Sequence, residues 1–467
     1  MAPSPARAMA LRIGAVVVCI GAALAAAVVE KRASAPEPGV ATNFPAALTA
    51  SEILGAIPPP AGSPETAKAL TAALRKALAK PENAAAWVRV GNALAQALRD
   101  TADEKFYAHA EAAYREALRL NPQSVDALIG MAWVTGGRHL FGDSKTWANR
   151  ALALDAGNAA ACGILGDAAV ELGDYDAAFE HYQRMMDLKP DLSSWSRGAH
   201  LLWLTGEGEK AKWLMDKAIK AGSPLAENTA WCQAKLAIML FHEGALDAAT
   251  EVIAPALRAA PKNSHVLLAA GRIAVAREDF PAAEKHFQAV LETTPNHEAL
   301  VALGDLRAAQ GAPVEVEKSY AQVVSLDVLQ TASAGHSHLA LAKFFADHDR
   351  QPVEALRLAE ARKLTQNVHE ADTLAWVYYK NGDGVRAAEA MSRALRHKTP
   401  DAEIHYHAGM IAAAAGDRAA AQQQLQEALR LNPRFSLLQG PLAVKALEQL
   451  GGTAATAAAP AKAGATP

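Results

Sequence analysis

The sequence predicts an all-α protein in which about ten similar helix pairs follow one another along the chain. Hydrophobic residues make up 51% of the 467 residues and aromatic residues only 6%, so the apolar content is mostly alanine, leucine and valine, and alanine is the strongest helix former. Between residues 84 and 434 the helical patterns come in pairs, and residues that end helices recur at nearly equal steps. Composition, pairing and period together indicate a repeat protein of close-packed helices.

The ends of the repeats are marked by prolines and their substitutes. Proline stops a helix because it lacks the backbone N–H that the next turn requires. A period near 34 residues with two helices means that each unit packs only against its neighbours. Successive markers are 33 to 38 residues apart, and they are Pro122, Ala156, Pro190, Pro224, Pro261, Pro295, Val328, Gln366, Pro400 and Pro433.

The unit that ends at Pro190 shows the pattern of small and large residues most completely. A small residue at Gly166 lets the paired helices approach closely, and the ring of Tyr182 fills the space beside it. The units that end at Pro295 and Pro433 repeat this register. The motif residues are therefore expected to be structural. In the first of these units they are Leu165, Gly166, Gly173, Tyr175, Ala178 and Tyr182.

With this motif at this period, the chain resembles the tetratricopeptide repeat (TPR) family over about three quarters of its length. The resemblance implies a right-handed superhelical solenoid of about ten helix-turn-helix units. It also implies that the first helix of each unit forms an inner face that carries partner peptides. On this reading the protein is not an enzyme and needs no cofactor.

The N-terminus carries a targeting signal. Arg7 and Arg12 precede an uncharged apolar run at residues 13–29. Its length lies between that of a cleaved signal peptide and that of a membrane-spanning helix, so both fates stay open. We expect a membrane-anchored protein whose repeat array is extracytoplasmic (periplasmic), or a protein secreted after signal cleavage.

The composition outside the repeats completes the expected organisation. A Pro-rich stretch favours extended chain, and the ends of a solenoid need polar caps. The expected segments are a signal peptide or transmembrane anchor at 1–32, a Pro/Ala-rich flexible linker at 33–63, an N-terminal capping helix at 64–83, the repeat array at 84–434, a C-terminal capping helix at 435–450 and a disordered tail at 451–467.

Charge and cysteine content exclude two classes of function. Lys plus Arg number 46 against 49 Asp plus Glu, and the charges are scattered, so no basic surface for nucleic acid is expected. The three cysteines are too few for a disulfide framework and lack the paired spacing of a zinc site. Cys162 and Cys232 lie two units apart and are not expected to bond to each other.

Apolar and aromatic residues gather on the expected inner face. They suit an amphipathic helix or an extended apolar peptide of a partner protein, although side chains at helical spacing also pack between successive units. The candidate partner-binding residues are Trp133, Leu201, Trp203, Trp231, Ile238, Phe241 and Arg272.

The histidines are the residues that most suggest a chemical role such as metal binding. The pairs His336/His338 and His405/His407 are two residues apart, so neither forms the i, i+4 arrangement of a helical chelate. No metal site is therefore predicted. The predicted function is a non-catalytic protein–protein interaction scaffold of the bacterial cell envelope, of unknown oligomeric state. The alternatives are a metal-binding or regulatory accessory subunit of an envelope enzyme complex, and a self-assembling structural protein.

Overall fold

The computed structural model describes residues 64–101, 103–223, 226–334 and 338–452. Over these residues the elements are all helical, with 22 α-helices and the short 3₁₀ helices η1 (Glu360–Arg362) and η2 (Leu395–His397). The expected signal or anchor, the linker and nearly all of the expected tail lie outside the described residues. No helix within the described ranges is long and apolar enough to cross a membrane.

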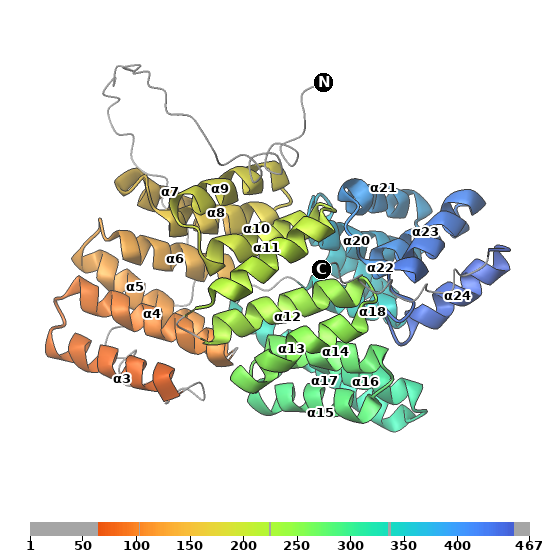
Figure 1. The fold of residues 1–467 in the computed structure, drawn as a ribbon, viewed down its shortest axis with the longest axis horizontal. Coiled ribbons are helices and arrows are strands. Elements are labelled where there is room, and N and C mark those ends of the chain that lie inside the picture. Colours follow the sequence, from red (N-terminus) through yellow and green to blue (C-terminus); the bar gives the residue numbers. More distant parts are fainter. Residues whose placement is uncertain (1–63, 102, 224–225, 335–337, 453–467) are drawn as a thin grey trace, which may run out of the picture.

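The helices form ten antiparallel pairs that follow one another, as the repeat predicts (Figure 1). Within a pair the two helices pack closely, and each pair also contacts the next. A further helix stands at each end, in the ranges expected to cap the array: α3 (Pro64–Ala79) and α24 (Gln439–Gln449). The pairs are α4 (Ala84–Thr101) with α5 (Lys105–Leu120), α6 (Val125–Gly137) with α7 (Phe141–Leu154), α8 (Ala159–Glu171) with α9 (Tyr175–Leu188), α10 (Leu192–Leu204) with α11 (Gly208–Ala221), α12 (Ala226–His242) with α13 (Leu246–Ala259), α14 (Ser264–Ala276) with α15 (Phe280–Thr293), α16 (His297–Ala309) with α17 (Pro313–Ala334), α18 (Leu339–Asp347) with α19 (Pro352–Ala359), α20 (Val368–Lys380) with α21 (Gly384–Ala394), and α22 (Ala402–Ala414) with α23 (Arg418–Leu431).

Small and large residues interlock inside the pairs as the motif predicts. A Cβ atom added at Gly166 would lie 2.2 Å from the ring of Tyr182, and one added at Gly271 would lie 2.4 Å from the ring of Phe287. Any larger side chain would therefore push the two helices apart. The motif residues hold the pairs together, and the all-α solenoid of about ten units is confirmed.

The turns between paired helices also follow the sequence. Gly173 takes a positive φ of 74°, and Asp174 then caps α9 by accepting a hydrogen bond from the amide of Ala177 at 3.2 Å. Gly416 and Asp417 repeat this arrangement before α23. Glycine adopts this backbone conformation without the steric cost of a Cβ, and aspartate satisfies a free amide of the first helical turn.

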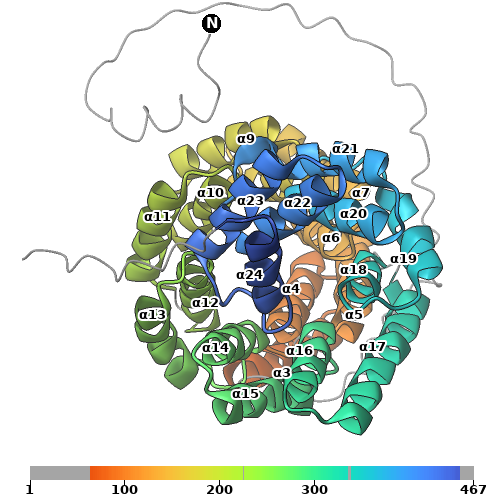
Figure 2. The same cartoon turned by 90° about the vertical axis from the view of Figure 1, so that its right-hand side faces the viewer.

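The array turns through a full ring and meets itself. In Figure 2 the helices run round a ring, with α12, α14, α16 and α18 on its inner side and α11, α13, α15, α17 and α19 on its outer side. The C-terminal ends of α8, α10 and α12 lie against the loops at 366–367, 397–400 and 431–434, and we call this contact the seam. Side-chain hydrogen bonds cross it: Asn367 Nδ2 donates to the carbonyl oxygen of Val170 at 3.3 Å, Thr399 Oγ1 to that of Leu204 at 2.5 Å, and Asn432 Nδ2 to that of Phe241 at 2.7 Å.

Candidate functional site

A pocket of about 400 Å³ opens on the inner side of the ring, next to the seam. Its walls come from the inner helices α12, α14, α16, α18 and α22, from Phe287 of α15, and from the segment at 434–439 that leads into α24. We call it the inner pocket. Its apolar part is formed largely by Phe241, Phe287, Phe344 and Phe435, and charged side chains surround this part. Because five different units contribute, the pocket exists only when the array has turned back on itself.

The seven candidate partner-binding residues do not form one surface. Phe241 and Arg272 both line the inner pocket, and the guanidinium of Arg272 is exposed, 2.7 Å from the carboxylate of Glu298. Trp133 lines a different hollow, where its ring lies 5.9 Å from that of Tyr107. The binding role of all seven stays a prediction.

The other four candidate residues differ in how much of each side chain is exposed to solvent. Leu201 is fully buried and Trp203 is 5% exposed, so both pack in the core of the array. Trp231 and Ile238 are half-buried on α12, and the ammonium of Lys235 lies 5.3 Å from the ring centre of Trp231. Trp231 and Ile238 therefore keep part of their side chains accessible, as Arg272 does, whereas Leu201 and Trp203 do not.

A lysine joins two carboxylates at the wall of the inner pocket. Lys343 Nζ lies 2.6 Å from Asp347 Oδ2 and 2.8 Å from Glu403 Oε1. Burial alone would lower the pKa of Lys343, but the two carboxylates outweigh burial and raise it above its usual value. Burial conversely favours a high pKa for Glu403, and Lys343 overcomes this and lowers it. Lys343 and Glu403 are thus both charged in the folded protein.

His407 lies directly behind this cluster and is completely buried. Its Nδ1 lies 2.9 and 3.1 Å from the two oxygens of Asp372, and its ring stacks on Trp376 with 4.1 Å between ring centres. Burial lowers the pKa of His407, but the charge and hydrogen bond of Asp372 exceed this effect and raise it. The imidazole is therefore held in one orientation by a carboxylate on one edge and an indole on its face.

Several buried polar atoms at this site have no hydrogen-bonding partner among the described residues. They are His407 Nε2, His297 Nε2 and the side-chain oxygen of Gln439. His297 and Gln439 line the inner pocket. Buried polar atoms are rarely left without a partner, so this region is built to receive water, an ion or a polar ligand.

Sequence reasoning did not identify Asp347, Glu403 or His407 as a group. One signal was present: Glu403 and His407 are four residues apart on α22 and so lie on one face of that helix. Spacing between histidines does not reveal this pair, because it consists of a carboxylate and a histidine. Asp347 comes from α18, 56 residues earlier in the chain than Glu403, and only the packing of the array brings it there.

Comparison with known proteins concerns the repeat. Two family profiles, each described as a tetratricopeptide repeat, match the sequence, one at residues 240–323 and the other at residues 141–193 and 373–434. No curated protein matches the chain.

Solved structures of repeat proteins resemble the chain at low identity. A thermophilic TPR protein of Thermus thermophilus is 20% identical, with 44% of this chain and 99% of that chain covered and a TM-score of 0.35. The human IFIT1 dimer with m7Gppp-AAAA is 16% identical, with 71% and 76% covered and a TM-score of 0.48. The Cut9–Hcn1 hetero-tetramer of the APC/C is 14% identical, with 83% and 76% covered and a TM-score of 0.41.

The matched segments coincide with the helix pairs that the structure contains. Residues 141–193 include α7 to α9, residues 240–323 include α13 to α16, and residues 373–434 include α21 to α23. Sequence motif, period, helix pairing and family profiles agree on the nature of the repeat. The chain is a tetratricopeptide-repeat protein.

Proposed function

We propose that this protein is a non-catalytic scaffold of the cell envelope that binds segments of partner polypeptides on the inner face of its ring. Tetratricopeptide repeats form protein-interaction scaffolds in general, and this chain carries them. The observation that carries the proposal is the inner pocket, an apolar hollow with a charged rim on the face that the first helices form.

The partner segment is a short peptide or helix rather than a whole folded surface. The volume of about 400 Å³ falls at the lower end of the range of about 300–1,000 Å³ found for ligand pockets. Half-buried Trp231 and Ile238 and exposed Arg272 supply further contact on neighbouring inner helices. Leu201 and Trp203 are buried and pack beneath the residues of this face. Trp133 lines a separate hollow, where a longer partner segment makes a second contact.

The setting is the membrane of the cell envelope. The apolar run at 13–29 supports a membrane anchor with the array on the extracytoplasmic side, or secretion if the run is cleaved. The net charge of −3 and the scattered basic residues give no support to a nucleic-acid partner. The partners of the proposal are therefore proteins of the envelope.

Affinity capture tests the proposal with a matched pair of variants. The full chain, tagged at its C-terminus, is recovered from detergent-solubilised cells, and its N-terminal sequence is read to establish whether the apolar run is retained. The Trp231→Ala, Arg272→Ala double variant should lose a partner that the parent chain recovers. Trp213→Ala is the control, because Trp213 is 53% exposed on the outer helix α11.

The outcomes separate the possibilities. Loss of the partner in the inner-face variant, with retention by Trp213→Ala, supports the proposed surface. Retention by both variants, with unchanged helix content, removes the inner face as the binding surface. Recovery of the chain alone in every case favours self-assembly.

A further inference from the structure

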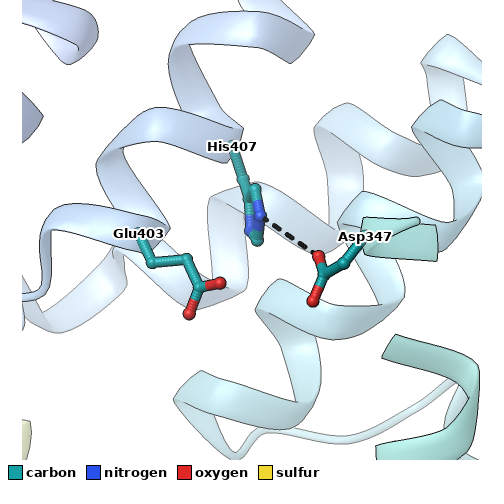
Figure 3. Close-up of side chains that lie close together, drawn as sticks. All are labelled: Asp347, Glu403 and His407. Carbon is teal, nitrogen blue, oxygen red and sulfur yellow. Dashed lines mark ion pairs between the residues drawn. The ribbon is translucent and has the colours of Figure 1, made fainter. Parts of the chain in front are cut away.

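Asp347, Glu403 and His407 lie close together, next to the ion pairs of Lys343 (Figure 3). Asp347 is the last residue of α18, and the other two lie one helical turn apart on α22. One nitrogen or oxygen atom of each residue lies within 4.8 Å of those of the other two. A single point between the three side chains is therefore within reach of an imidazole nitrogen and two carboxylate oxygens.

His407 is prepared for a ligand on the side that faces this point. Asp372 holds Nδ1, and Nε2 therefore faces the carboxylates. His407 is 0% exposed, and its Nε2 has no hydrogen-bonding partner within the part of the chain that the structure describes. Asp347 Oδ1 lies 4.0 Å from it, which is too far for a hydrogen bond. A buried nitrogen in this position calls for an occupant.

The set of donors identifies the class of occupant. One imidazole nitrogen with two carboxylate oxygens is a ligand set that zinc and similar divalent transition metals accept. Histidines that bind metals usually donate their other N–H to a carboxylate, and Asp372 stands in that place. Tetrahedral bonds of about 2.0–2.2 Å place ligand atoms about 3.3–3.6 Å apart. The three atoms, now within 4.8 Å of one another, must therefore approach by up to about 1 Å, and side-chain rotations of Asp347 and Glu403, both partly exposed, allow this.

We propose that Asp347, Glu403 and His407 bind a divalent transition metal ion of the zinc type, with water in the remaining coordination position and Asp372 as the positioning residue behind His407. Asp347 and Glu403 also line the inner pocket, so the ion enters from there. The site goes beyond the proposed scaffold function and does not depend on which polypeptide the inner face binds.

Lys343 is the internal competitor of the metal ion. Its ammonium now neutralises both carboxylates, at 2.6 and 2.8 Å. An ion of charge +2 takes over this role only if the ammonium withdraws, and the Lys343 side chain, 29% exposed at the pocket wall, has room to do so. Removal of the lysine charge should therefore strengthen metal binding, which a purely structural ion-pair cluster does not predict.

Isothermal titration calorimetry of the chelator-treated full chain tests the site, with Zn²⁺ as the probe and a tag that contains no histidine. The parent chain should bind one Zn²⁺ in this region, Lys343→Met should bind it at least tenfold more tightly, and His407→Gln should abolish that binding. Asp372→Asn should weaken it about 10- to 100-fold, as removal of an outer-shell carboxylate does. Co²⁺ should give visible absorption bands in the parent chain and in Lys343→Met.

His405→Gln is the matched control. His405 lies on the same helix two residues away, and its Nδ1 lies 2.7 Å from Gln424 Oε1 instead of at the cluster. It should leave the Zn²⁺ affinity unchanged. The absence of Zn²⁺ binding in both the parent chain and Lys343→Met, with helix content intact by circular dichroism, would overturn the proposal. Equal loss of binding in His405→Gln and His407→Gln would overturn it as well.

Discussion

The side-chain amide of Asn432 donates a hydrogen bond of 2.7 Å to the carbonyl oxygen of Phe241, 191 residues earlier in the chain. Asn432 is 1% exposed, and Phe241 lies at the end of an inner helix and lines the inner pocket. The bond joins the tenth unit to the fifth. The seam is thus a tertiary interface within one solenoid, and it holds the walls of the inner pocket in place.

Asn432→Ala should lower the free energy of unfolding by about 0.5–1.5 kcal/mol, because the Phe241 carbonyl loses one of its two hydrogen-bonding partners and keeps the amide of Gly244. Urea unfolding measures the loss, and hydrogen exchange should show the faster opening in α22 to α24. Asn121→Ala is the control, since Asn121 holds the equivalent position after α5 in the first unit and is exposed there. Its effect should stay within about 0.5 kcal/mol, as surface substitutions usually do. Equal losses in the two variants would contradict a stabilising seam.

Two glycines with the same backbone conformation differ in whether the seam packs against them. Gly173 and Gly416 have φ values of 74° and 80°, so alanine is strained at either position. At Gly173 an added Cβ would also lie 2.2 Å from the carbonyl carbon of Gln366, whereas at Gly416 it would meet nothing within 4 Å. Gly416→Ala should cost about 1 kcal/mol, and Gly173→Ala about 2–4 kcal/mol because overpacking adds to the strain.

Thermal unfolding of both glycine variants, followed by circular dichroism, gives the comparison. If Gly173→Ala costs no more than Gly416→Ala, the loop at 366–367 does not press on the α8–α9 turn in solution.

The sequence was sufficient for the units because each unit is encoded locally. The step of about 34 residues, the pairing of Gly166 with Tyr182 and the capping of α9 by Asp174 all act within one unit or between neighbours. The seam was not predictable in this way. Asn367 and Asn432 have the sequence context of ordinary helix ends, and their partners are fixed only by the curvature of the whole array.

The candidate site, like the fold, was predictable from the sequence only in part. Of the residues chosen from the apolar inner stripe, Phe241 and Arg272 reach the inner pocket, while Leu201 and Trp203 are core residues. Apolar spacing cannot separate a groove from the packing between units, because both need the same side chains. The group of Asp347, Glu403 and His407 forms only because Asp347 of α18 packs beside α22, and no periodicity within α22 reveals that contact.

The thiols of Cys162 and Cys232 are both free and fully buried. Burial raises the pKa of Cys162 and raises that of Cys232 to about 12, so neither is a thiolate near neutral pH. In a Cys19→Ser chain, a disulfide reagent such as dithionitrobenzoate should therefore release no colour from the folded protein and two equivalents in denaturant. Rapid reaction of either thiol under native conditions would mean that its unit opens readily.

Alkaline pH should unfold the array because its tyrosines ionise more readily in the unfolded chain than in the folded one. Burial is the leading cause that raises the pKa of all eight, among them Tyr114 and Tyr182, which fill the spaces beside the small residues of their units. A phenol near pH 10 ionises in the unfolded chain but stays neutral in the folded one. The stabilising effect of a raised pKa is thus fully present below about pH 10 and is lost as the pH rises through the folded value.

Two signals recorded together check this. The absorbance of tyrosinate at about 295 nm should stay low near pH 10 and rise only when the helical circular dichroism falls, whereas the same titration in urea should show ionisation near the ordinary value. Tyr182→Phe removes one ionisable phenol and its 2.8 Å hydrogen bond to Asp167 but keeps the ring beside Gly166. It should therefore shift the alkaline transition to higher pH even if it lowers stability near neutrality. Tyrosines that all titrate near pH 10 in a chain with intact helices would show that their rings are open to water.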